Sequence, residues 1–179
     1  LAGRYLMFTP ILEGKPFAHA VGKLVCVGRN YAEHAREMKA ELPTEPVLFI
    51  KPADAACDIG AQISIPIDRG SVHHELEIAV LIGERLVNAS EQEAAQAIAG
   101  IGLGLDLTLR DLQDQLKAKS LPWERSKAFD GASPLTEFVK AERVNNWQQL
   151  SFSLTRNGQL QQRGESSEMI FSVLSLLAS

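Results

Sequence analysis

The sequence has 179 residues, of which 45% are hydrophobic and 22% are charged, with a formal net charge of -4. This composition indicates one globular domain, and the acidic balance without Lys- or Arg-rich runs excludes an electrostatic nucleic-acid surface. Two isolated cysteines exclude a disulfide framework, and without a signal-peptide pattern or an apolar run of about 18 residues we expect a cytoplasmic protein with no membrane partner.

The first expected elements are a strand at 23–28 and a helix at 30–39. In this helix His34 and Glu37 are three residues apart, so their side chains are neighbours on one face. The carboxylate could orient the imidazole and raise its basicity, as a general base that activates water requires. The alternative is an ordinary surface contact.

A second strand is expected at 47–50, and Lys51 follows it directly before a proline. This position makes Lys51 a candidate for a positioned cation. An alternating segment at 62–67 and a turn at 68–70 then lead into the strand 73–83, with the sequence HHELEIAVLIG. His73 and His74 begin this strand, and we interpret them as structural or supporting residues.

Two carboxylates lie in this otherwise apolar strand. Glu75 and Glu77 are two residues apart, so they project to the same face, and apolar residues fill the rest of both faces. A buried pair of like charges is unstable unless a cation, a proton or hydrogen bonds neutralise it, and a hard divalent metal would do so. The alternative is an edge strand with two solvated glutamates.

A helix at 91–99, capped by Ser90, precedes a glycine-rich strand at 100–105 with the sequence GIGLGL. The glycine spacing is that of neither a dinucleotide-binding loop nor a P-loop, so it indicates close packing. We expect Asp106 to open a helix at 106–119, in which Asp106, Arg110 and Gln113 share one face. They could form a surface ladder, or Asp106 could join Glu75 and Glu77 around Mg²⁺ or Mn²⁺.

The remaining chain contains a polar loop at 123–129, a hairpin and an apolar C-terminal segment. Lys127 lies in the loop as either a functional or a solvated lysine. The hairpin pairs 151–156 with 160–163 around Asn157-Gly158. The segment 169–178 has helical spacing, and because the sequence stops within it we expect the polypeptide to continue past Ser179. Short strands mixed with helices predict an α+β fold rich in antiparallel structure.

Six segments in this order and spacing resemble the fumarylacetoacetate hydrolase superfamily, in particular its short acylpyruvase and oxaloacetate-acting branch. They are GRNYAEHAREM, EPVLFIKP, HHELEIAVLIG, GLDLTLRDLQ, LPWERSKAFD and GESSEMIFS. The resemblance implies a β-rich β-roll with flanking helices, usually as a homodimer. It implies an N-terminal segment at 1–22 and a catalytic domain at 23–179, whose C-terminal part, including a family Gly-Thr-Pro loop, is missing from this sequence.

The resemblance also implies roles for individual residues. Mg²⁺ or Mn²⁺ would be bound by Glu75, Glu77 and Asp106, while His34 and Glu37 would form a water-activating dyad. Lys127 would stabilise negative charge, and Arg110 and Gln113 would face a small 2-oxo acid substrate. The implied reaction is hydrolysis of the C–C bond of acylpyruvates, such as acetylpyruvate or fumarylpyruvate, to pyruvate and a carboxylic acid.

Other functions use nearly the same residues. Decarboxylation of oxaloacetate gives the same pyruvate enolate, and keto–enol tautomerisation of oxaloacetate needs the same stabilisation without breaking a carbon bond. A hypothesis of a different class is a noncatalytic module that binds a small acid and holds a structural metal in a closed shell. In the simplest alternative no metal binds, and Arg110 and Lys127 neutralise the acids.

Overall fold

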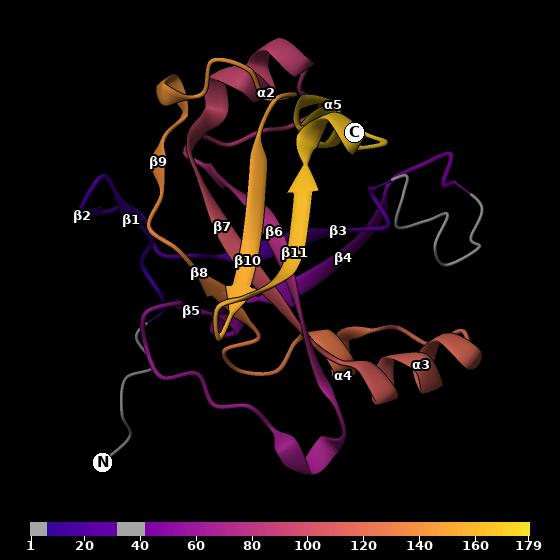
Figure 1. Cartoon of the computed structure of the whole chain (residues 1–179). Coiled ribbons are helices and arrows are strands. Elements are labelled where there is room, and N and C mark those ends of the chain that lie inside the picture. The colour runs from indigo at the N-terminus through magenta and orange to yellow at the C-terminus, as the bar shows by residue number, and fades with distance from the viewer. Residues whose placement is uncertain (1–6, 32–41) are drawn as a thin grey trace. The chain divides into compact units, whose positions relative to one another are not determined.

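The computed structural model describes residues 7–31 and 42–179. The strands are β1 Ile11–Leu12, β2 Lys15–Pro16, β3 Lys23–Gly28, β4 Val47–Pro52, β5 Ala56–Asp58, β6 Val72–Ile82, β7 Ile98–Leu109, β8 Ser133–Leu135, β9 Val139–Lys140, β10 Ser151–Arg156 and β11 Gln159–Glu165. The α-helices of this part are α2 Glu91–Ala97, α3 Arg110–Ala118, α4 Glu124–Lys127 and α5 Val173–Ala178. Single 3₁₀ turns cover Ala53–Ala55, Ile67–Arg69, Ala141–Arg143 and Ser166–Glu168. The predicted α+β class is confirmed (Figure 1).

Two compact units share the chain. The first comprises residues 1–26, 49–79 and 102–139, and the second comprises 27–48, 80–101 and 140–179. The long strands β6 and β7 contribute residues to both units. None of the helices in the described ranges is long and apolar enough to cross a bilayer.

The largest sheet has the hydrogen-bonded order β5-β8-β7-β6, and β9 also pairs with β7. β5 and β8 are parallel, whereas β7 and β8 are antiparallel with Gly104 opposite Leu135. The glycines of β7 allow this close approach, because a Cβ at Gly102 or Gly104 would come within 2.9 Å of a side chain from the segment 135–136. The predicted packing role of the GIGLGL glycines is thus confirmed.

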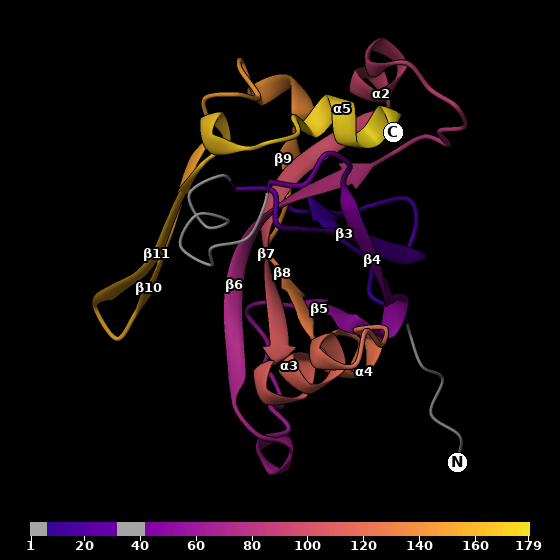
Figure 2. The ribbon, with the colours of Figure 1, turned by 90° about the vertical axis from the view of Figure 1, so that its right-hand side faces the viewer.

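A small core in the first unit consists of Ala55, Leu107 and Ala132, all buried. Partly buried apolar side chains pack against it from β3, β6, β7 and the α4–β8 connection, namely Leu24, Val72, Leu105 and Phe129. In Figure 2, α3 and α4 lie side by side in this unit.

In the second unit, β10 and β11 form an antiparallel hairpin that Figure 1 shows as a long two-stranded ribbon. Asn157 and Gly158 both have positive φ, at 53° and 77°, which is the requirement of the tight turn predicted for this dipeptide. Helices α2 and α5 are in contact. Ser90 caps α2 as predicted, and the structure adds a reciprocal capping box with Glu93.

Several local details differ from the sequence patterns. The alternating segment 62–67 forms no strand, and it leads into the 3₁₀ turn Ile67–Arg69. The C-terminal helix begins only at Val173, because Ser172 caps it and accepts a hydrogen bond from the Ser175 amide. Strand β6 is less buried than expected, with Leu76 its one fully buried residue.

Candidate functional site

Three acidic side chains of the first unit come from neighbouring strands. Glu75 and Glu77 lie in β6, two residues apart as predicted, and Asp106 lies in β7. The prediction that Asp106 opens a helix is wrong, because the strand continues through Leu-Asp-Leu-Thr-Leu and α3 begins at Arg110. Leucines alternate here with the polar residues Asp106 and Thr108, and this period of two favours a strand. Asp106 therefore reaches the two glutamates from an adjacent strand and does not share a helical face with Arg110 and Gln113.

Two lysines neutralise Asp106. The Lys51 Nζ atom lies 2.7 Å from its Oδ1 atom, and the Lys127 Nζ atom lies 2.5 Å from its Oδ2 atom. The side chain of Lys51 is 0% exposed and that of Lys127 is 4% exposed. Buried lysines require such partners, since an unpaired ammonium group in an apolar interior is strongly disfavoured.

Glu75 is held by two cations. Lys127 Nζ donates to its Oε2 atom over 3.0 Å, and Arg110 Nη2 donates to its Oε1 atom. Arg110 is fixed in turn, because its Nη1 atom donates to Gln113 Oε1 over 2.6 Å. Burial opposes the charge of Glu75, but Lys127 and Arg110 outweigh burial and hold the pKa of this carboxyl below its usual range. The structure thus brings together Glu75, Asp106, Lys127, Arg110 and Gln113.

Glu77 has the opposite electrostatic balance. Burial, with the nearby charges of Asp106 and Glu75, raises the pKa of Glu77 to about 8. The nearby Lys127 charge lowers this pKa, but it does not offset burial and the two neighbouring acids. The neutral form of this carboxyl group is therefore favoured more than for an ordinary glutamate, and an added cation would favour the charged form.

The donor chemistry of the three acids fits a hard divalent cation. All three offer carboxylate oxygens, which Mg²⁺ and Mn²⁺ prefer. In the part of the chain that the structure describes, however, no three His, Cys, Asp or Glu side chains are gathered closely enough to form a metal site. The assignment of Glu75, Glu77 and Asp106 as metal ligands therefore stays a prediction.

Lys127 lies in a short helix, α4. The sequence predicted a polar loop at 123–129, with no helix in it. The helical turn is formed by amides of Ser126 and Lys127 that donate to the Trp123 carbonyl, which also accepts from the Ser126 hydroxyl. The turn buries the lysine, whose Nζ atom lies 5.2 Å from the centre of the Phe49 ring. The interpretation of Lys127 as a solvated lysine is excluded.

The roles expected for four further residues, His34, Glu37, His73 and His74, stay predictions. His34 and Glu37 lie outside the described residues, so their dyad stays a prediction. His73 and His74 lie at the start of β6, and their interpretation as supporting residues stays a prediction as well. Cys26 was not predicted as a site residue, yet burial and the nearby Asp106 charge raise the pKa of its thiol to about 12. Its place in a predicted buried strand was the available signal.

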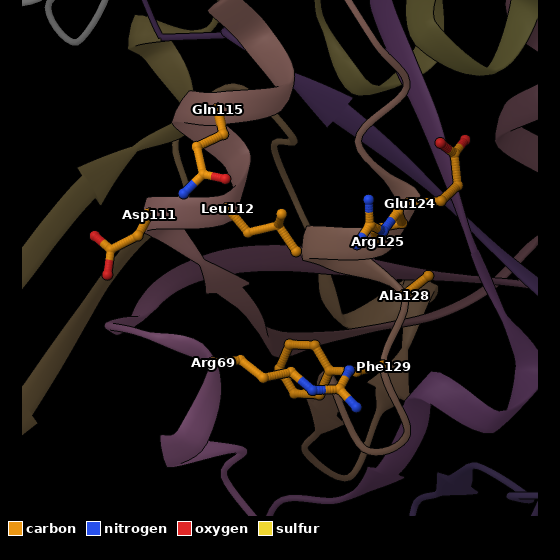
Figure 3. Close-up of a pocket in the computed structure, with 8 residues that line it drawn as sticks. All are labelled: Arg69, Asp111, Leu112, Gln115, Glu124, Arg125, Ala128 and Phe129. Atoms are coloured by element: carbon orange, nitrogen blue, oxygen red, sulfur yellow. The ribbon is translucent and has the colours of Figure 1, made fainter.

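A cavity of about 620 Å³ lies beside α3 and α4. Figure 3 shows its lining, in which Leu112 projects from α3 toward α4. Its residues are Arg69, Asp111, Leu112, Gln115, Glu124, Arg125, Ala128 and Phe129. None of these eight is a predicted site residue, so this cavity is distinct from the cluster of carboxylates and lysines.

Residues 23–179 match the family model described as Fumarylacetoacetate (FAA) hydrolase C-terminal. The chain belongs to the fumarylacetoacetate hydrolase family. This assignment confirms the resemblance found in the sequence and the prediction of an enzyme.

Known members of the fumarylacetoacetate hydrolase family are similar over most of the chain. Oxaloacetate tautomerase YcgM of Escherichia coli is 48% identical over 93% of this chain and 76% of its own length. The mitochondrial oxaloacetate tautomerase FAHD1 of Bos taurus is 46% identical over 84% of the chain and 68% of its own length. The mitochondrial oxaloacetate decarboxylase of Dictyostelium discoideum is 37% identical over 87% and 70%, respectively.

Solved structures confirm the family fold. A protein from Oleispira antarctica has a TM-score of 0.91 and 57% identity, with 96% of this chain and 78% of that chain covered. Fumarylpyruvate hydrolase from Pseudomonas aeruginosa, solved with Mn²⁺ and pyruvate, has a TM-score of 0.86 and 33% identity over 95% and 75% of the two chains. A divalent metal and a small 2-oxo acid thus bind to that family member.

These similarities correct the reaction inferred first from the sequence. Acylpyruvate hydrolysis is the activity named for a relative at 33% identity, whereas relatives at 37–48% identity are named oxaloacetate tautomerase or decarboxylase. The error has a chemical cause. Hydrolysis, decarboxylation and tautomerisation all stabilise an enolate, so the carboxylates and lysines alone do not distinguish them.

Proposed function

We propose that this enzyme interconverts the keto and enol forms of oxaloacetate. The observation that supports this reaction over its alternatives is the 48% identity to an oxaloacetate tautomerase across 93% of the chain. The cluster around Glu75 and Asp106 supplies the required chemistry, because oriented cations can stabilise the negative charge that develops on the enolate oxygen.

The reaction moves one proton and breaks no carbon–carbon bond. A proton leaves C3 of oxaloacetate, the electron pair forms the C2–C3 double bond, and the C2 oxygen is protonated. We propose that His34, oriented by Glu37, carries this proton. Lys127 would stabilise negative charge on the oxygen, since its buried ammonium group is held in place by Glu75 and Asp106.

Arg110 is the proposed anchor for a substrate carboxylate. Its guanidinium group already contacts one carboxylate, Glu75, and is oriented by Gln113, whose side chain is buried. A planar guanidinium group held in this way can present further N–H donors to a second carboxylate in a fixed direction.

Glu75, Glu77 and Asp106 are the proposed ligands of Mg²⁺ or Mn²⁺. When bound, such an ion would act as a Lewis acid that polarises the 2-oxo group. Glu77 supports this assignment, because burial and the charges of Asp106 and Glu75 raise its pKa, and a bound cation would offset both effects.

Decarboxylation of oxaloacetate is a second candidate, because one relative at 37% identity is named for it. The same cation cluster would stabilise the enolate that loss of CO₂ leaves behind. The two activities are separated by their products, since only decarboxylation yields pyruvate.

The test is to offer pure enol oxaloacetate to the metal-stripped chain, with and without Mg²⁺ or Mn²⁺. Loss of enol absorbance is followed together with pyruvate. Fast metal-dependent enol loss without pyruvate supports the tautomerase, pyruvate formation at a matching rate supports the decarboxylase, and no acceleration of either reaction contradicts both.

Glu75→Ala is the matched loss-of-function variant. It is expected to abolish metal-dependent turnover while the fold persists, and circular dichroism checks the fold. Glu84→Ala is the control, because Glu84 is an exposed acid just beyond the end of β6. Activity that is unchanged in Glu75→Ala would contradict the role of this carboxylate.

A further inference from the structure

Hydrogen bonds join the start of β6 to the first turn of α3 in the first unit. The Ser71 amide donates to Asp111 Oδ2 over 2.8 Å, and the Ser71 hydroxyl donates to Asp111 Oδ1 over 2.9 Å. The Arg110 amide donates in turn to the Ser71 carbonyl over 2.9 Å. Ser71 directly precedes β6 and Asp111 is the second residue of α3, so these bonds fix the end of one element against the other. Figure 3 shows the Asp111 side chain projecting away from α4.

The residues around this contact, the Ser71–Asp111 clamp, are suited to it. Gly70 has a φ of 95°, and a Cβ at this position would lie 2.5 Å from Asp111 Oδ2, closer than two nonbonded atoms can approach. Glycine therefore allows the carboxylate to reach the Ser71 amide. The bonds from Ser71 hold the pKa of Asp111 below its usual range, so the carboxylate accepts them in its charged form. A negative charge in the first turn of a helix is also favourable.

The same two elements are joined a second time by side chains of the proposed site. Arg110, the first residue of α3, donates from Nη2 to Glu75 of β6 and from Nη1 to Gln113. One contact between two elements acts as a pivot, whereas a second contact at a separate point restricts rotation about the first. The Arg110 side chain is 23% exposed, and a guanidinium group has five N–H donors, so it can also donate to a bound ligand.

We infer that Asp111 is a positioning residue that holds Arg110 in the direction required to bind a carboxylate of the substrate. This inference rests on the substrate anchor proposed above. An arginine that is already fixed need not be ordered when the substrate binds, and ordering such a side chain reduces affinity. Loss of the clamp should therefore raise KM and leave the chemical step nearly unchanged.

The experiment measures kcat and KM of the full chain for enol oxaloacetate, with Mg²⁺ or Mn²⁺ present. Asp111→Ala removes both acceptors of the clamp. Asp111→Asn keeps the shape, because its carbonyl can accept from the Ser71 amide and its NH₂ group can donate to the Ser71 hydroxyl. Asp114→Ala is the matched control, since Asp114 is an exposed acid of the same helix. Ser71→Ala removes only the hydroxyl bond and replaces Asp111→Ala if that variant does not fold.

We expect KM to rise about threefold in Asp111→Ala, with kcat within about twofold of the parent value. KM should stay near the parent value in Asp111→Asn and Asp114→Ala. The double variant of Asp111→Ala with Arg110→Lys tests whether Asp111 acts through Arg110. In that case the loss of Asp111 should raise KM no further in the Arg110→Lys background, because the two effects are coupled.

A role limited to stability would lower the melting temperature of Asp111→Ala and leave KM unchanged. That result, or a rise in KM that adds in full to the effect of Arg110→Lys, would overturn the inference while the proposed function stands. If the parent chain accelerates no reaction of oxaloacetate, the proposed function fails. If the parent is active but Arg110→Lys leaves KM unchanged, the substrate anchor fails and this inference fails with it.

Discussion

The Lys127 ammonium group contacts carboxylates from two strands, Glu75 in β6 and Asp106 in β7. Lys127→Met should lower kcat for enol oxaloacetate about 10²- to 10³-fold, because a fixed cation beside the developing oxyanion is lost. Stopped-flow decay of the enol absorbance measures this change. Lys119→Met should retain the parent rate, and equal rates in both variants would remove Lys127 from the mechanism.

Arg110 provides a second prediction for a single residue. Its two terminal nitrogens contact different partners, Glu75 and Gln113, so the guanidinium plane is fixed. Lysine keeps the charge but lacks this planar fork. Arg110→Lys should therefore raise KM for oxaloacetate about tenfold, with a smaller effect on kcat. Steady-state kinetics separate the two constants, and an unchanged KM would argue against substrate anchoring by Arg110.

At the scale of elements, the close packing of β7 depends on glycine. A Cβ at Gly102 would lie 2.9 Å from Thr136 Oγ1 and 3.2 Å from the Glu137 carbonyl oxygen. Thr136 Oγ1 also accepts a hydrogen bond from the Leu103 amide over 2.9 Å, so it has little freedom to move. Gly102→Ala should lower the free energy of unfolding by about 1–3 kcal/mol, measured by urea denaturation.

Gly22→Ala is the control for the alanine substitution in β7. A Cβ at Gly22 would meet no atom within 4 Å, so this variant should change the free energy of unfolding by less than about 1 kcal/mol. Equal destabilisation in the two variants would show that the effect is not caused by close packing.

Elements with a strong local signal could be predicted from the sequence. The strand containing Glu75 and Glu77 was visible in its run of apolar residues, helix α2 in its capping residue, and the hairpin in Asn157-Gly158. Each of these signals is encoded within a few residues, so no tertiary contact was needed to recognise it.

The site was harder to predict, because burial of a lysine depends on carboxylates far away in sequence. Lys51 and Asp106 are 55 positions apart, and Lys127 and Glu75 are 52 apart. Helix α4 has only four residues and its intrinsic signal is weak. Asp106 was placed in a helix because its spacing to Arg110 fitted a helical face, whereas tertiary pairing of β7 with β8 favoured the strand.

For the whole molecule, the homodimer and the boundary between 1–22 and 23–179 stay predictions.

The stability of the whole folded chain should depend on pH through the carboxyl group of Glu77. The pKa of Glu77 is about 8 in the folded chain and 4.5 ordinarily, so between these values the unfolded chain binds fewer protons. The free energy of unfolding should therefore fall as pH rises from 5 to 8 in metal-free protein.

The contribution of Glu77 is isolated by comparison with Glu77→Gln, which cannot titrate at this position. Glu75 does not affect this comparison. Its pKa is lowered in the folded chain, so the stability that it contributes is lost only when the pH falls below this range. We expect the melting temperature of the metal-free parent, relative to Glu77→Gln, to fall steadily from pH 5 to pH 8. Parallel curves for the two proteins would show that Glu77 does not carry a raised pKa.

Added Mg²⁺ should oppose this loss of stability. A metal ion binds the ionised carboxylate, so its binding releases the Glu77 proton below pH 8 and becomes tighter as pH rises. The increase in melting temperature caused by saturating Mg²⁺ should therefore be larger at pH 8 than at pH 6, and small in Glu77→Gln at both values.

Calorimetry at pH 7 in two buffers of different ionisation enthalpy should detect release of up to one proton per Mg²⁺ ion bound. Stabilisation by Mg²⁺ that is independent of pH and unaffected by Glu77→Gln would place the ion elsewhere in the protein.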